Sequence, residues 1–263
     1  MTGPSTGLLV GERPDDVGAH RALAVRGVDK SFTTAQGVVH ALHGVDLDVD
    51  LGEFVAVVGA SGCGKSTLLS LVADLDQPTA GSVRRADRVA LMFQDATLLP
   101  WLTARANVEL ALRLRGVPRT ERAAEVDRLL AVVRLTGTGD RRPDELSGGM
   151  RQRVALARCL AQGTRIIAMD EPLGALDAMT RDHLHDEIER VAAEQRLTVL
   201  FVTHNMREAV RLADRVVLMA GGRVVHEQVV GLPRPRVMDS AEVATRAADL
   251  TARLRAAGRE GAA

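Results

Sequence analysis

Residues 59–67, GASGCGKST, combine glycines with a lysine and hydroxyl side chains in an order that suits phosphate binding. From Gly59 to Ser66 they match the pattern G-x-x-x-x-G-K-[ST], in which backbone N–H groups curl around phosphate oxygens at the start of a helix. In such a loop the lysine reaches the outer phosphates and the serine hydroxyl binds Mg²⁺. We therefore expect a phosphate-binding loop that comprises Gly59, Ser61, Gly62, Cys63, Gly64, Lys65, Ser66 and Thr67.

The surroundings of this loop favour phosphate binding over a chance glycine turn. An apolar strand is predicted to end at Gly59, and the stretch KSTLLSLVADL predicts a helix over residues 65–75, which is the context that the pattern requires. Thr67 is expected to be a second phosphate donor. Cys63 is expected to fill a variable loop position that is exposed to nucleotide, so that a thiol reagent there should block binding.

Two acidic residues follow the apolar run RIIAM at residues 165–169. Asp170 would end a buried strand at the sheet edge where the phosphate loop also lies, and a carboxylate there can hold Mg²⁺. Because neighbouring residues at a strand end point in different directions, Glu171 can face the attacking water as a general base. Two such acids often only begin a solvated loop, but the nearby phosphate loop favours the catalytic interpretation.

A second stretch with phosphate-binding character, LSGGMRQR, spans residues 146–153. Ser147 can cap a helix that begins there, so that the N–H of Gly149 and the positive helix end can face an anion. A flexible turn that leads into the helix MRQRVALARCLA is the local alternative. The chain therefore carries two candidate phosphate-binding elements.

The pattern of apolar residues predicts an α/β fold. The stretches ALAVRGVDKSF and VVHALHGVDLDVDLGEFVAVVG alternate apolar and polar residues, as half-buried antiparallel strands do, up to Gly59. The unbroken apolar runs RIIAMD and LTVLFVTH indicate parallel strands buried on both faces. A helix that carries Leu184, Ile188 and Val191 is expected between them, and residues from about 96 to 160 are expected to be helical.

The C-terminal part predicts a hairpin and a helix. RVVLMAGGRVVHEQVV indicates a hairpin that turns on its glycine pair, and DSAEVATRAADLTARLRAAG indicates a helix capped by Asp239 or Ser240. One face of this helix is apolar, and we expect it to pack on its own domain rather than to form a regulatory docking site. The residues of this face are Val243, Ala247, Leu250 and Leu254. We expect a flexible segment over 1–20, one domain over 21–235 with a helical subdomain at about 96–160, and a C-terminal helix and tail over 236–263.

Composition limits the classes of partner. Basic and acidic residues are equal in number, 34 each, so that no overall field favours nucleic acid or an anionic membrane. No stretch approaches the roughly 20 apolar residues that a membrane-spanning helix needs. Cys63 and Cys159 lack metal-ligand spacing and are expected to be reduced thiols in a reducing compartment. The apolar run near the N-terminus is too short for a signal-peptide core, so we expect a cytoplasmic protein.

Taken together, GASGCGKST, LSGGMRQR, RIIAMDEPLGALD and VTH closely resemble the motifs of the ATP-binding cassette (ABC) ATPases over residues 22–228. The most specific of them is LSGG shortly before the acidic strand. The resemblance implies ATP and Mg²⁺ as ligands. It also implies the fold, an α/β P-loop NTPase core with a mixed sheet, an N-terminal antiparallel β subdomain and an inserted α-helical subdomain.

The resemblance also implies roles for four further residues. Phe32 in KSF is similar to the aromatic residue that stacks on adenine, although packing within a strand is an alternative. Gln94 in MFQD is similar to the glutamine that links the metal and the water to the helical subdomain. Asp177 in GALD matches an aspartate at the dimer seam, and His204 matches the histidine that touches the γ-phosphate.

In this family two cassettes stack head to tail, which explains a second phosphate-binding element. The resemblance implies a homodimer in which Ser147, Gly148 and Gly149 of one subunit close over the nucleotide held by Lys65 of the other. ADP lacks the γ-phosphate, so ATP would bind the closed dimer better than the open one. Only such a difference in affinity can shift the equilibrium between the two states.

A cassette on its own chain resembles the nucleotide-binding subunit of a bacterial importer, peripheral on the cytoplasmic face of the cell membrane. The partners implied are integral membrane permease subunits and, indirectly, an extracytoplasmic solute-binding protein. The stretches FQDATLLPWLTARANVEL and LPRPR resemble cassettes of the nitrate, sulfonate and taurine uptake group, which implies a small anion as cargo. Leu98, Leu99 and Trp101 would line the groove for the permease, with burial of Trp101 inside the helical subdomain as the alternative.

Other functions stay open as alternatives: an exporter subunit, a soluble cassette that acts on nucleic acid or ribosomes, and a phosphate-loop kinase. The basic stretch RLRGVPRTER has no interleaved aromatic residues, so nucleic-acid binding is not expected. His183 and His185 lie two positions apart on a predicted helix and do not face together, which favours a solvated helix face over a metal site. Asp74 stands where members of the family commonly have glycine, and Asn205 replaces the usual aspartate.

Overall fold

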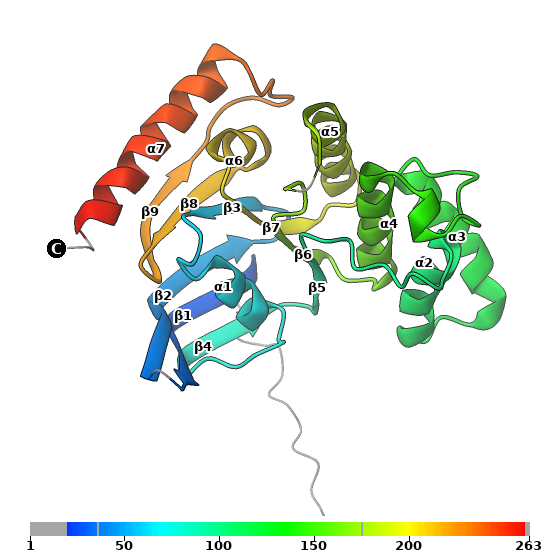
Figure 1. The fold of residues 1–263 in the computed structure, drawn as a ribbon, viewed down its shortest axis with the longest axis horizontal. Coiled ribbons are helices and arrows are strands. Elements are labelled where there is room, and N and C mark those ends of the chain that lie inside the picture. Colours follow the sequence, from blue (N-terminus) through cyan, green and yellow to red (C-terminus); the bar gives the residue numbers. More distant parts are fainter. Residues whose placement is uncertain (1–19, 36, 175, 261–263) are drawn as a thin grey trace, which may run out of the picture.

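The strands of the computed structural model, which describes residues 20–35, 37–174 and 176–260, form two sheets (Figure 1). The antiparallel sheet has the order β2-β1-β4 and the larger sheet the order β5-β6-β7-β3-β8-β9. In the larger sheet the neighbours from β5 to β8 are parallel and β9 is antiparallel, so the expected mixed sheet is confirmed. The strands are β1 (Arg21–Thr34), β2 (Gly37–Asp50), β3 (Phe54–Gly59), β4 (Ala80–Arg85), β5 (Val89–Met92), β6 (Ile166–Asp170), β7 (Thr198–Thr203), β8 (Arg215–Ala220) and β9 (Arg223–Val229).

The alternating stretch over residues 38–59 is divided between the two sheets. β2 ends at Asp50, the chain turns through Gly52 at φ +78°, and β3 begins at Phe54 in the larger sheet. The prediction of a half-buried antiparallel strand up to Gly59 was therefore wrong for β3, which is parallel to both of its neighbours and buried at every position. The alternation of apolar and polar residues ends at Leu51, and residues 54–58 form a continuous apolar run, which is typical of a strand buried on both faces.

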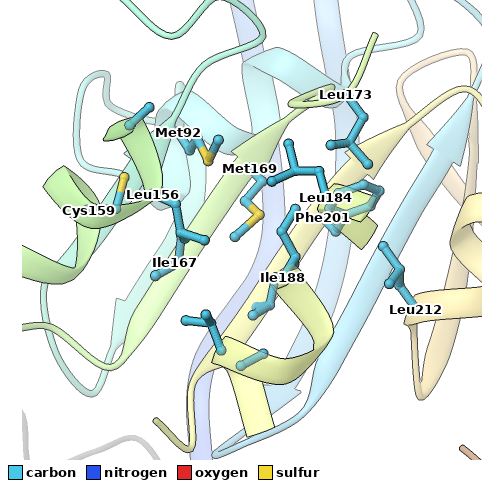
Figure 2. Packing of buried hydrophobic residues seen from close by; sticks show 14 of the residues in the cluster. Met92, Leu156, Cys159, Ile167, Met169, Leu173, Leu184, Ile188, Phe201 and Leu212 are labelled. Atoms are coloured by element: carbon cyan, nitrogen blue, oxygen red, sulfur yellow. The ribbon is translucent and has the colours of Figure 1, made fainter. Parts of the chain in front are cut away.

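The larger sheet is buried on both faces, as the continuous apolar runs predict. Ile167, Met169 and Phe201 face a core that the helices α4, α5 and α6 cover (Figure 2). Val55, Val57 and Leu200 face a second core shared with α1 and the antiparallel sheet. The helices are α1 (Lys65–Val72), α2 (Ala104–Leu114), α3 (Arg119–Val132), α4 (Gly148–Ala161), α5 (Ala178–Glu194), α6 (Met206–Leu212) and α7 (Ala241–Glu260).

Helices α2, α3 and α4 lie together beside the sheets and form the inserted helical subdomain of the expected fold (Figure 1). In sequence they separate β5 from β6. Helix α1 is shorter than the predicted 65–75 and ends at Val72, because Asp74 has a left-handed φ of +61°. Glycine adopts this conformation without strain, which explains why a glycine suits this position.

The C-terminal elements follow the predictions. The β8–β9 hairpin turns on Gly221 and Gly222, both at positive φ. Ser240 Oγ accepts a hydrogen bond from the Val243 N–H at 3.3 Å, so Ser240 caps α7. The apolar face of α7 packs on its own domain near α6, with Leu250 fully buried. Residues 1–19 of the segment expected to be flexible lie outside the described residues.

Burial of the two cysteines agrees with reduced thiols. Cys63 and Cys159 are both free and buried. Among the helices that the structure describes, none combines the length and the apolar character required to cross a membrane.

Candidate functional site

A pocket of about 350 Å³ lies where β3 and β6 end at their carboxyl termini. Because β6, β7 and β3 are adjacent and parallel, the residues that follow them meet at one sheet edge. The pocket thus brings together the phosphate loop, the glutamine and the acids, which are far apart in sequence. Its lining residues are Ala41, Ser61, Gly62, Gly64, Lys65, Ser66, Thr67, Gln94, Asp170 and Glu171.

The loop that precedes α1 has the shape of a phosphate cradle. Lys65 Nζ donates hydrogen bonds to the carbonyls of Gly59 and Ala60, both at 2.9 Å, and so spans the loop. Gly64 has φ +102°, and a Cβ atom there would lie 2.6 Å from the Ala41 carbonyl oxygen. No side chain among the described residues caps the first turn of α1, so its N–H groups are free to face an anion. The residues present therefore fit a bound nucleotide phosphate.

Cys63 does not face the pocket, and the expectation that it is exposed to nucleotide was wrong. Its exposed fraction is 8%, and its side chain belongs to the core beneath the loop. A Cβ atom on Gly59 would lie 2.5 Å from Cys63 Sγ, so the thiol packs against the backbone at the end of β3. The chain reverses direction at this point, because the Cys63 N–H donates to the Ala60 carbonyl. Residue spacing alone does not show this orientation.

Asp170 and Ser66 form a pair of oxygen donors at the pocket floor. The two side chains are hydrogen-bonded to each other. Burial raises the pKa of Asp170, the hydrogen bond from Ser66 opposes this shift, the neighbouring charge of Glu171 adds to it, and Lys65 lowers it. A hydroxyl and a carboxylate that would gain from a nearby cation are suitable donors for Mg²⁺, which prefers oxygen ligands. The donor set therefore fits this ion.

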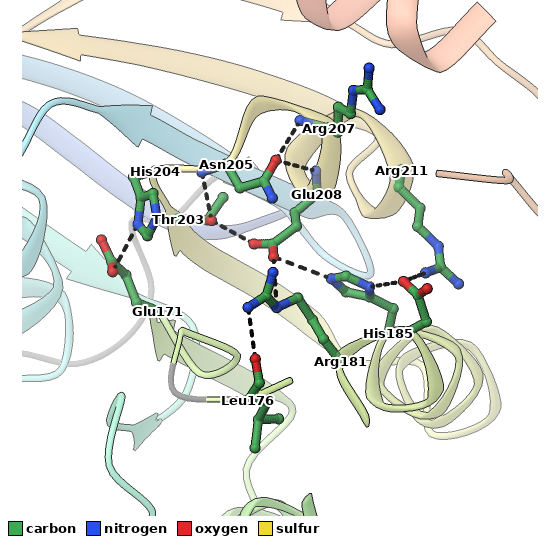
Figure 3. A network of polar contacts seen from close by, with 11 residues as sticks. Glu171, Leu176, Arg181, His185, Thr203, His204, Asn205, Arg207, Glu208 and Arg211 are labelled. Carbon is green, nitrogen blue, oxygen red and sulfur yellow. Dashed lines mark hydrogen bonds and ion pairs between the residues drawn. The ribbon is translucent and has the colours of Figure 1, made fainter. Parts of the chain in front are cut away.

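Glu171 lies beside His204 at the rim of the pocket. Glu171 Oε2 is 3.0 Å from His204 Nδ1 (Figure 3). The backbone N–H of Glu171 donates to the carbonyl of Val202 on β7, at 2.9 Å, which joins the ends of β6 and β7. Glu171 also has φ +44°, a left-handed conformation that side chains disfavour and that is frequent at functional sites. The predicted acid and the predicted histidine are thus brought together.

Gln94 and the segment after it are held by α4. The carbonyl of Gln94 accepts a hydrogen bond from Gln152 Nε2 at 2.7 Å. Arg158 donates to the carbonyls of Ala96 and Thr97 at 2.9 and 2.8 Å. The side chain of Gln94 lies close to Gly174, where a Cβ atom would be 3.1 Å from its amide nitrogen. Gln94 therefore connects the pocket with both α4 and the loop after Glu171.

Phe32 lies beyond the pocket lining, on the β1–β2 hairpin. It pairs with Val39, two residues before Ala41, which lines the pocket. Its exposed fraction is 40%, and Lys30 Nζ is 4.9 Å from the centre of its ring. Packing within a strand, the alternative that sequence left open, does not bury this ring. The ring is therefore partly exposed, with the Lys30 ammonium group over one of its faces.

Ser147, Gly148 and Gly149 do not line the pocket of their own chain. Ser147 caps α4 as predicted, because its Oγ accepts a hydrogen bond from the Met150 N–H at 3.3 Å. Gly149 packs against α5, where an added Cβ would lie 2.5 Å from a Thr180 methyl carbon. Asp177 has a role that sequence reasoning missed, since it caps α5 by accepting from the Thr180 N–H at 3.0 Å. These hydrogen bonds lower the pKa of Asp177.

Residues 42–174 match the family model described as "ABC transporter". The chain belongs to this family. It is 48% identical over 228 residues to the aliphatic sulfonates import ATP-binding protein SsuB of Rhodopseudomonas palustris (strain BisA53), a match that covers 84% of this chain and 79% of that protein. It is 42% identical over 229 residues to the bicarbonate transport ATP-binding protein CmpC of Synechococcus elongatus, covering 81% of this chain and 34% of that protein.

Solved structures give the same result for the ABC cassette. The dimeric ATP-binding cassette MJ0796, solved with ADP and Pi bound, superposes on this chain with a TM-score of 0.72 and is 32% identical to it in sequence. The match covers 80% of this chain and 100% of the MJ0796 chain. Motifs, fold and relatives agree that this ABC cassette binds nucleotide and is an ATPase.

Two further residues of the cassette are placed by the structure. The side chain of Trp101 is 68% exposed, so the alternative of burial in the helical subdomain was wrong. His185 is fully buried, whereas His183 is exposed, so a solvated helix face was wrong for His185. His185 lies next to Leu184 and three residues before Ile188, which places it on the buried side of α5.

Proposed function

We propose that the chain is the ATP-hydrolysing subunit of an importer for a small anion of the sulfonate class. In this proposal it acts as a homodimer attached to integral membrane permease subunits on the cytoplasmic side. The observation that carries the proposal is the 48% identity, over most of both chains, to an aliphatic sulfonates import ATP-binding protein. The similarity to a bicarbonate transport protein supports an anion as cargo and keeps bicarbonate and nitrate as alternatives.

Residues of the pocket would bind Mg-ATP in this proposal. The N–H groups of the loop from Ser61 to Thr67 surround the phosphates, and Lys65 exchanges its two carbonyl partners for phosphate oxygens. Ser66, Gln94 and Asp170 would hold Mg²⁺. When bound, this ion neutralises the charge that develops on the phosphate oxygens. Phe32 offers an exposed ring to adenine.

Glu171 and His204 would carry the chemical step. Glu171 accepts the proton of the attacking water, while Asp170 would be engaged with Mg²⁺ beside Ser66. His204, at 3.0 Å from the Glu171 carboxylate, keeps this carboxylate on the pocket side and contacts the γ-phosphate. Positioning and electrostatic stabilisation, rather than covalent chemistry, would supply most of the rate enhancement.

A partner subunit would complete the site. Ser147, Gly148 and Gly149 lie outside the pocket of their own chain, and Ser147 caps a helix whose positive end can face an anion. We infer that they close over the nucleotide of the second subunit, with Asp177 at the seam. Release of phosphate would then weaken the closed state.

Uptake by cells that lack this chain tests the proposal. Deletion should abolish ATP-dependent uptake of aliphatic sulfonates, and the wild-type chain should restore it, whereas Lys65→Ala should not. Restoration by Arg253→Ala, a change on the exposed side of α7, is the matched control for expression. Unchanged sulfonate uptake in the deletion strain, with loss of nitrate or bicarbonate uptake, would reassign the cargo. Unchanged uptake of every anion would contradict an importer function.

A further inference from the structure

A cluster of polar side chains, most of them buried, lies between α5 and α6 and begins next to His204 (Figure 3). At its centre is Glu208 on α6, which is 5% exposed. Its Oε2 atom accepts a hydrogen bond from Thr203 Oγ1 at 2.7 Å. Its Oε1 atom is 3.7 Å from His185 Nε2 and 3.8 Å from Arg181 Nε, both on α5. The carboxylate therefore joins the end of β7 to α5.

On one side, the cluster fixes the backbone around His204. The hydroxyl of Thr203 donates to Glu208 and also accepts a hydrogen bond from the Asn205 N–H at 3.0 Å. Asn205 in turn caps α6, because its Oδ1 accepts from the N–H groups of Arg207 and Glu208. The residues on both sides of His204 are thus anchored, while its own side chain is 63% exposed.

On the other side, the cluster holds the loop that begins with Glu171. Arg181 Nη2 donates a hydrogen bond to the carbonyl of Leu176 at 2.8 Å. Leu176 is buried and lies in the connection that leads from Glu171 to α5. Arg181 therefore contacts the Glu171 loop through Leu176 and the His204 loop through Glu208.

Accordingly, we propose that Glu208 is a positioning residue for ATP hydrolysis, which sets the separation of the two loops that carry Glu171 and His204. The inference rests on the function proposed above for those two residues. A misplacement of about 1 Å at a reacting group can cost on the order of 10² in rate, so a fixed separation matters. A buried ion pair is weak in stability terms compared with apolar packing, which makes a positional role the better explanation for its presence.

The charge state of Glu208 agrees with this role. Burial alone would raise the pKa of Glu208, but the contact with His185, the hydrogen bond from Thr203 and the positive charge of Arg181 lower it overall. Glu208 is therefore ionised at neutral pH and can hold Arg181. His185 Nδ1 also lies 3.6 Å from Asp182 on α5, and Asp182 lies 3.7 Å from Arg211 Nη1 on α6.

A double-mutant cycle with His204→Ala tests the inference in the full-length protein. Glu208→Gln keeps the shape of the side chain and an oxygen for Thr203 but loses the charge that attracts Arg181. We expect it to lower kcat by about tenfold, with KM for ATP within about twofold. In the His204→Ala background the same change should have no further effect on single-turnover hydrolysis, because residues that act as a unit are not additive.

Two control variants separate positioning from stability. Glu187→Gln removes a different buried carboxylate, which lies on α5 and pairs with Arg190 at 2.8 Å. It should lower Tm without lowering kcat. Thr203→Ser retains the hydroxyl and should keep the wild-type kcat, whereas Thr203→Val should reproduce the loss seen in Glu208→Gln.

The outcomes distinguish this inference from the proposed function. If Glu208→Gln lowered the rate of hydrolysis by the same factor in the wild-type and in the slowed His204→Ala backgrounds, the positioning role of Glu208 would be overturned, but the function proposed for the site would not. An unchanged kcat in Glu208→Gln would do the same. Wild-type turnover in His204→Ala would instead remove His204 from the reaction, and the function proposed for the site would fail with it.

Discussion

Asp170 and Glu171 are neighbours in sequence, yet single-residue contacts give them different chemistry. Asp170 interacts with Ser66 and Lys65, and burial raises the pKa of its carboxyl. Glu171 instead contacts His204, from a backbone conformation that turns its side chain toward the rim. The local sequence motif predicted both acids and a separate role for each, whereas the contacts that hold Glu171 against His204 and β7 depend on the fold.

Glu171→Gln is expected to lower the rate of ATP hydrolysis by about 10² to 10⁴, because the amide cannot accept the proton of the attacking water. ATP affinity should stay within about twofold, since the phosphate loop is unchanged, and ATP should then accumulate the dimer. Phosphate release, nucleotide titration and sedimentation measure the three quantities. Glu194→Gln, at the far end of α5, is the control. Normal turnover in Glu171→Gln would exclude this residue as the base.

Both thiols are expected to resist alkylation in the folded protein. Burial raises the pKa of the Cys159 thiol to about 12 from 9.0, so its thiolate fraction at neutral pH falls by about 10³. Cys63 is shielded by the packing of the phosphate loop. Mass spectrometry after iodoacetamide treatment should show little labelling until a denaturant is added. Fast labelling of native Cys63 that also blocks ATP binding would restore the exposed position expected from sequence.

At the scale of elements, periodicity predicted most helices and strands and missed what depends on long-range contacts. The strands β6 and β7 and the helix between them follow from continuous apolar runs and helical spacing. The inward face of α5 also carries His185, because Glu208 on α6 supplies a partner that no local pattern reveals. The stretch LPRPR likewise gains a structural explanation, since buried Arg236 donates to the carbonyls of Val210 and Ala213 and so closes the end of α6.

The packing of α5 on α6 should depend on pH through Glu208. The pKa of Glu208 in the folded protein lies below its usual value of 4.5. The ionised carboxylate therefore stabilises the folded protein above pH 4.5, and this stabilisation is lost as the pH falls through the lower pKa of the folded state. Glu208→Gln should therefore lower the free energy of unfolding by about 1 to 3 kcal/mol at pH 7, and the difference from wild type should shrink below about pH 4.5. Urea unfolding at both pH values measures this, and a difference that grows on acidification would contradict it.

At the scale of the whole molecule, the second candidate phosphate-binding element, Ser147 to Gly149, lies outside the pocket formed by the first. The motifs and the resemblance to ABC ATPases predicted this architecture. The division of the stretch 38–59 between two sheets was missed, although the alternation of residue types stops at Leu51 and residues 54–58 are all apolar. That these residues join the larger sheet depends on their pairing with β7 and β8, which no local pattern shows. Spatial separation of the elements is what a composite site between two subunits requires.

Mixing two inactive variants should restore hydrolysis if the sites are composite. Lys65→Ala damages the pocket, and Ser147→Arg damages the α4 end, so each protein alone should be nearly inactive. A mixed dimer contains one site with both parts intact, and an equimolar mixture should regain up to about a quarter of wild-type activity, because half of randomly formed dimers are mixed and each has one of two sites. Asp144→Arg in place of Ser147→Arg is the control for charge. A mixture that stays inactive would contradict the composite site, because it would mean that the Lys65 pocket and the Ser147 end of α4 must come from the same chain.

Ser147 caps the start of helix α4. Further along the helix, Gln152 and Arg158 donate hydrogen bonds to the backbone carbonyls of Gln94 and Thr97. These two residues are close in sequence to the exposed Trp101. A ligand that touches the first turn of this helix and a protein that covers Trp101 would therefore act on one rigid body. Thermodynamic reciprocity then applies: by whatever factor docking alters the affinity for nucleotide, nucleotide alters the affinity for docking. A membrane partner that never touches ATP can in this way govern how firmly ATP is held.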